Sequence, residues 1–163
     1  MGRLCVKDRQ FDELIRTHAG AVSAYARALA SDRWTAEDAV QETFLRAWKY
    51  LDSYRGSGSF EGWLLRICRN CLIDLAARGT PEPVAVLPDR SEAPDTSADV
   101  FDLVRRLPIE QREVVVLCGL LGYEYQDVAG LLELPIGTVR SRLHRARAAL
   151  SGILDERTED RSA

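Results

Sequence analysis

A proline-rich, acidic segment near the middle of the chain divides it in two. Residues 79–98 hold four of the six prolines, and four carboxylates stand there against a single arginine. Proline cannot continue a helix, and it biases the preceding residue towards extended conformations. We therefore expect an extended acidic linker over 79–98. It joins one domain over 1–78 to a second over 99–155, which a C-terminal tail over 156–163 follows.

The parts on either side of this segment show the apolar spacing of amphipathic helices. In the first part, we expect Thr35 and Asp38 to form a capping box at the start of a helix. A loop rich in glycine and serine follows at 54–59, and Ser59 can cap the next helix. Nothing in the chain is typical of a pair of strands. The sequence thus predicts an all-α fold of two small helical domains.

Charge is distributed unevenly along the chain. The net charge of −3 taken alone argues mildly against a nucleic-acid partner. Residues 79–134, however, carry 11 acidic and 4 basic residues, whereas residues 135–150 carry four arginines and no acidic residue. A compact basic segment therefore lies behind an acidic one. On charge alone, a solvated helix face remains an equal alternative to a nucleic-acid interface.

The basic segment has the pattern of a recognition helix. At 3.6 residues per turn, Val139, Leu143, Ala146 and Leu150 form one apolar stripe, and the opposite face is polar and cationic. A short helical window and a tight connection precede it, which indicates a helix-turn-helix whose second helix enters the major groove. Arginine can pair with guanine there, and serine or threonine can reach bases or phosphates. The alternative is a helix packed in a bundle with solvated arginines. The candidate DNA contacts are Thr138, Arg140, Ser141, Arg142, His144 and Arg145.

Three sequence motifs resemble motifs of one protein family and follow one another in the same order as in that family. Residues 38–48 (DAVQETFLRAW) resemble region 2.2 of the bacterial extracytoplasmic-function (ECF, group IV) sigma factors of the sigma-70 family. Residues 107–113 (LPIEQRE) resemble the start of their region 4, and residues 135–147 (PIGTVRSRLHRAR) resemble their minus-35 recognition helix. The resemblance spans about residues 9–155. It implies a region 2 helical bundle and a region 4 helix-turn-helix on the two sides of the linker.

The resemblance implies a sigma factor that binds core RNA polymerase, directs promoter-specific initiation and is controlled by an anti-sigma factor. Its region 2.2 helix would bind the coiled coil of the largest-subunit clamp. The candidate polymerase contacts are Asp38, Gln41, Glu42, Leu45 and Arg46. The loop after this helix and the next helix would recognise and melt the minus-10 element, with aromatic rings stacking on unpaired bases. The candidate minus-10 contacts are Tyr54, Arg55, Ser57, Phe60, Arg66, Arg69 and Asn70.

The chain departs from the family pattern in the helix-turn-helix. Glu133 stands where the family commonly has glycine, and a non-glycine residue is strained there if the turn needs a positive φ. Glu124 stands where serine or threonine usually caps the preceding helix, and glutamate is a weaker cap.

Alternative functions depend on other features. Cys68 and Cys71 form a CxxC pair, but a zinc site needs four ligands and neither a second CxxC nor a histidine pair lies nearby. Buried free thiols are favoured over a redox protein. We expect no enzyme activity, no cofactor and no metal. A stand-alone helix-turn-helix regulator with a helical effector domain remains the main alternative, and the motif at 38–48 favours the sigma factor.

No membrane span or export signal is expected. The N-terminus lacks an apolar signal core, and no apolar run approaches about 20 residues. We expect a cytoplasmic protein that associates with the nucleoid in the holoenzyme. An anti-sigma partner could hold it at the membrane.

Overall fold

The computed structural model describes residues 2–56, 58–79 and 96–160, and the chain divides into two compact units, residues 1–80 and 81–163. Its described residues contain helices and no strand, so the predicted all-α fold of two helical domains is confirmed. Most of the expected linker, residues 80–95, lies outside the described residues. None of the helices in the described ranges is long and apolar enough to cross a membrane.

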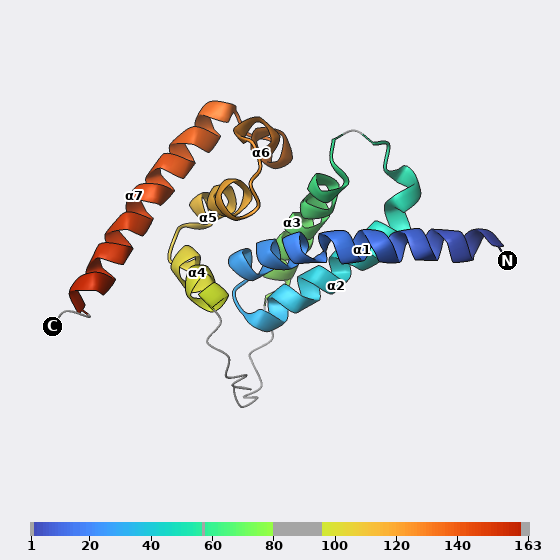
Figure 1. The fold of residues 1–163 in the computed structure, drawn as a ribbon, viewed down its shortest axis with the longest axis horizontal. Helices are drawn as coiled ribbons and strands as arrows, with labels where there is room; N and C mark the ends of the chain where they lie inside the picture. Colours follow the sequence, from blue (N-terminus) through green and yellow to red (C-terminus); the bar gives the residue numbers. More distant parts are fainter. Residues whose placement is uncertain (1, 57, 80–95, 161–163) are drawn as a thin grey trace. The chain divides into compact units, whose positions relative to one another are not determined.

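The first unit is a bundle of three helices that all pack on one another (Figure 1). They are α1 (Gly2–Leu29), α2 (Arg33–Tyr50) and α3 (Phe60–Arg78), with a short 3-10 turn, η1 (Leu51–Ser53), after α2. Fully buried side chains from α1 and α3, among them Val22, Tyr25, Leu64 and Leu65, fill the centre. On its inner side α2 contributes small residues, which allows close approach of the helices.

The start of α2 differs from the prediction. Asp32, and not Thr35, caps the helix, because its carboxylate accepts hydrogen bonds from the Thr35 amide and the Thr35 hydroxyl, both at 2.8 Å. These hydrogen bonds lower the pKa of Asp32, the amide of Thr35 contributing most. The expected capping box at Thr35 and Asp38 was therefore wrong by one turn. The prediction for α3 is confirmed, since Ser59 Oγ accepts from the Gly62 amide at 3.0 Å.

The second unit contains α4 (Thr96–Arg105), α5 (Ile109–Val115), a π-helical segment η2 (Val116–Leu120), α6 (Tyr125–Leu132) and α7 (Ile136–Asp160). Helix α7 packs on α5 and α6, and the buried side chains between them include Val114, Leu117 and Val128. The corner between α4 and α5 is held by Arg112, which donates to the carbonyl oxygens of Arg105 and Leu107 at 2.7 and 3.0 Å.

Three helix boundaries in this unit differ from the expectations. Helix α4 begins at Thr96, inside the expected linker, and α7 continues to Asp160, through most of the expected C-terminal tail. The window expected to form one helix up to Leu121 changes to π-helix after Val115, with the Leu121 amide donating to the Val116 carbonyl at 2.9 Å. Apolar periodicity does not distinguish an α-turn from a π-turn of the same residues.

Candidate functional site

Helix α2 turns the residues of the predicted polymerase surface away from the bundle. Ala36, Ala39, Thr43 and Ala47 are buried on its inner side. The Thr43 hydroxyl is satisfied within the helix, where it donates to the Ala39 carbonyl oxygen at 2.6 Å. Asp38, Gln41 and Leu45 are exposed, and Glu42 and Arg46 are half-buried.

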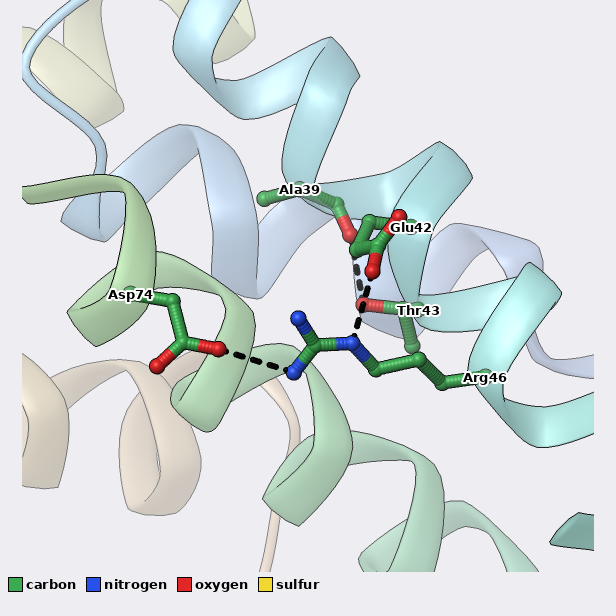
Figure 2. A network of polar contacts seen from close by, with 5 residues as sticks. All are labelled: Ala39, Glu42, Thr43, Arg46 and Asp74. Atoms are coloured by element: carbon green, nitrogen blue, oxygen red, sulfur yellow. Dashed lines mark hydrogen bonds and ion pairs between the residues drawn. The ribbon is translucent and has the colours of Figure 1, made fainter. Parts of the chain in front are cut away.

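Arg46 links α2 to α3, as Figure 2 shows. Its Nε donates to Glu42 Oε1 at 2.7 Å, one turn back on α2, and its Nη1 donates to Asp74 Oδ2 on α3 at 2.9 Å. Hydrogen bonds to these two carboxylates raise the pKa of Arg46 further above its ordinary value. The guanidinium is therefore held in one orientation by side chains of both helices.

A polar cleft of about 250 Å³ lies at this junction. The structure brings all five candidate polymerase contacts together around it. Helix α3 adds four lining residues that the sequence did not indicate: Cys71, Asp74, Leu75 and Arg78. The sequence gave no signal that Asp74 would meet Arg46, 28 residues earlier.

Both cysteines of the CxxC pair are fully buried, and Cys71 lines this cleft. Burial raises the pKa of Cys68 to about 12. Burial also raises the pKa of Cys71. Across the described residues, no three or more His, Cys, Asp or Glu side chains lie close enough to hold a metal ion. The pair has the environment of structural thiols, which are unreactive because the thiolate is disfavoured.

The candidate minus-10 residues lie around the loop between α2 and α3. Tyr54 and Phe60 are half-buried, and they pack on Trp63 and on each other, with ring centroids 5.2 to 5.3 Å apart. The structure joins these rings in one cluster, and the stacking of an unpaired base on Tyr54 and Phe60 stays a prediction. Arg55, Arg66 and Asn70 are exposed and Arg69 is half-buried. Ser57 lies outside the described residues.

Helices α6 and α7 form the predicted helix-turn-helix. The turn residue Glu133 has φ 56° and ψ 44°, the left-handed conformation that favours glycine. Glu124 occupies the N-cap of α6 and makes no side-chain capping hydrogen bond. Both departures from the family pattern therefore have the structural consequence that the sequence indicated.

The two faces of α7 are clearly separated. Val139, Leu143 and Ala146 are at most 3% exposed. On the other side, Arg140, His144 and Arg145 are exposed. The remaining candidates, Thr138, Ser141 and Arg142, are half-buried at the edge of this face. In the part of the chain that the structure describes, Arg140, Arg142 and Arg145 form no ion pair, so their charge is available to an outside partner.

This architecture defines a helix-turn-helix protein with a separate helical bundle. The family described as Sigma-70 region 2 matches residues 14–80, and that described as Sigma-70, region 4 matches residues 97–150. The chain belongs to the sigma-70 family and is an extracytoplasmic-function sigma factor.

Individual relatives agree with this assignment. The ECF RNA polymerase sigma factor SigE of Mycolicibacterium smegmatis is 36% identical over 92% of this chain, which spans 63% of SigE. SigM of Mycobacterium tuberculosis is 35% identical to this chain, and the match covers 88% of this chain and 76% of the length of SigM. The sigma factor RpoE of Bartonella quintana, solved in complex with the anti-sigma factor NepR, superposes with a TM-score of 0.75 at 30% identity. That match covers 90% of this chain and 98% of RpoE.

Proposed function

We propose that this sigma factor docks on core RNA polymerase through the cleft between α2 and α3 and directs the enzyme to promoters. The observation that carries the proposal is the convergence of all five candidate contacts on that one cleft. The exposed Leu45 beside it supplies an apolar anchor, since 65% of the residue is accessible. The occupant would be the coiled coil of the largest-subunit clamp, and a helix-on-helix contact suits a polar rim around such an anchor.

The DNA contacts divide between the two units. The exposed face of α7 would read the minus-35 element in the major groove, with its unpaired arginines on bases or phosphates. The loop between α2 and α3 would capture an unpaired base of the minus-10 element on its aromatic cluster. Neither contact needs a catalytic group, and we propose that the protein is not an enzyme.

Control by an anti-sigma factor is part of the proposal. It is supported by the similarity to RpoE, whose solved structure contains the anti-sigma factor NepR. We further propose a cytoplasmic location, with association to the nucleoid in the holoenzyme and retention at a membrane when an anti-sigma factor anchors it there.

Run-off transcription with core polymerase of M. smegmatis and a promoter selected from a randomised duplex pool tests the proposal. We expect transcripts that depend on adding the chain. Leu45→Ala should reduce association with the core about tenfold, in the range of an interface anchor. Ile73→Ala is a matched control, because Ile73 on α3 is also exposed but does not line the cleft.

The stand-alone regulator makes the opposite prediction. Tight binding of the isolated chain to a duplex operator, without any core-dependent transcript, would favour that alternative. Undiminished association of the Leu45→Ala variant would refute the proposed interface while leaving the function intact.

A further inference from the structure

A polar contact joins the middle of α1 to the first turn of α3. His18 Nδ1 lies 2.9 Å from Glu61 Oε2, and because a carboxylate only accepts, the ring nitrogen donates. The two side chains are 18% and 27% exposed, at the edge of the bundle. Their neighbours Val22 and Tyr25 are fully buried and carry the packing of α1. The contact is therefore an addition to the core and not a part of it.

The same histidine touches the aromatic cluster of the minus-10 loop. Its ring centroid lies 5.6 Å from that of Phe60, which in turn packs on Tyr54 at 5.3 Å. The Tyr54 hydroxyl donates to the Gly58 carbonyl oxygen at 2.9 Å and so spans the loop. A continuous path of contacts thus runs from α1 through Phe60 to the loop backbone.

The loop needs such support because its own backbone is permissive. Gly56 and Gly58 have φ of 71° and 87°, a backbone conformation that residues with a side chain rarely adopt. A Cβ added at either glycine would meet nothing within 4 Å. The loop conformation is consequently set by what its two ends pack against. Ring stacking depends on relative orientation, so a displaced ring binds a base less well.

We propose that His18 is a positioning residue for minus-10 recognition. Through Glu61 and Phe60 it fixes the start of α3, and with it the ring faces of Phe60 and Tyr54 on which an unpaired base would stack. This inference rests on the proposed function of the loop. It assigns a role in DNA recognition to a residue of α1 that does not itself reach the base.

Binding of the reconstituted holoenzyme to fork-junction DNA tests the role. One fork carries the selected promoter with an unpaired minus-10 base. The second fork has an abasic site in place of the minus-10 base whose removal weakens binding of the wild-type holoenzyme most. Because a positioning residue acts through the captured base, His18→Ala should weaken binding to the intact fork about three- to tenfold. On the abasic fork the same variant should equal wild type.

Glu61 and Thr17 supply the matched variants. Glu61→Ala should reproduce the loss, and the double variant with His18→Ala should add nothing to it. Glu61→Gln keeps an acceptor oxygen and should retain most of the binding. Thr17→Ala is the control on α1, because among the described residues the exposed Thr17 hydroxyl donates only to the Glu13 carbonyl oxygen of its own helix.

Two results would overturn the inference: equal losses on the intact and abasic forks, or a double variant whose loss is the sum of the single losses. A thermal melt of each variant separates these from general unfolding. If wild type itself gives no promoter-dependent transcript and does not distinguish the two forks, the proposed function fails, and the role of His18 falls with it.

Discussion

On α2, the side chains around the predicted polymerase cleft also hold the helix to its neighbour, whereas on α7 binding and packing fall on opposite sides of the helix. Arg46 belongs to the cleft and at the same time donates to Asp74 on α3. Arg140, Arg142 and Arg145 of α7 form no ion pair among the described residues, and Val139 and Leu143 on the other side carry the packing.

This difference separates two ways of preparing a surface for a partner. On the α2 surface, Glu42 and Asp74 already hold the Arg46 guanidinium, so this side chain needs little further ordering when a partner arrives. On the α7 surface, no carboxylate among the described residues pairs with Arg140, Arg142 or Arg145, and such uncompensated positive charge suits a polyanion. Substitutions should therefore affect stability and binding together on α2 but separately on α7.

The largest expected effect is on the packing side of α7. Leu143→Ala should lower the free energy of unfolding by about 2–5 kcal/mol, because it removes a buried side chain and leaves a cavity. Leu154→Ala on the same helix should change it by less than about 0.5 kcal/mol, since Leu154 is 48% exposed. Chemical denaturation measures both. Similar losses of unfolding free energy for the two variants would mean that Leu143 and Leu154 are equally buried, contrary to the structure.

The DNA side of α7 should show the next largest effect. Arg140→Ala or Arg145→Ala should weaken use of the minus-35 element by about 1–3 kcal/mol if these residues read bases, with no change in melting temperature. Run-off transcription from the selected promoter measures the loss. On a promoter with a substituted minus-35 element the loss should disappear; an unchanged preference would contradict the assignment.

Raising the pH should destabilise the first unit through its buried thiols. Because the pKa of Cys68 is about 12 in the fold and 9.0 as the reference for an exposed thiol, its contribution to stability is complete below pH 9 and is lost between pH 9 and 12. By pH 10, wild type should lose about 1 kcal/mol more than a Cys68→Ala, Cys71→Ala variant. Parallel pH profiles of unfolding for the two proteins would count against this account.

The smallest effect expected is the coupling between Arg46 and Asp74. A double-mutant cycle to alanine should give a coupling of about 0.5–1 kcal/mol in the free energy of unfolding, because both partners are partly exposed. The same Arg46→Ala variant should also bind core polymerase more weakly. A zero coupling together with reduced binding would make α2 resemble α7, and the contrast between the two surfaces would disappear.

Local and periodic features were predictable from the sequence. The buried stripe of α7 follows from a period of 3.6 residues, and the Ser59 cap follows from residue type and position. The positive φ at Glu133 was indicated only by the family resemblance, in which glycine is common at that position. The pair of Arg46 and Asp74 was not predictable, because it depends on how two helices meet across 28 residues. The cap of α2 was misplaced because Asp32 and Thr35 are both good caps, three residues apart.

The π-helical segment at Val116–Leu120 has a consequence for how this domain can change over evolutionary time. Its hydrogen bond from the Leu121 amide to the Val116 carbonyl closes a ring one residue larger than that of an α-helix. Removing one residue, such as the exposed Gly119, would restore the α-helical ring, and because the π-turn holds that extra residue within a single wider turn, the elements that follow would keep nearly the same direction. This turn can thus lose a residue through a single codon deletion while α6 and α7 keep their place against the buried residues before them.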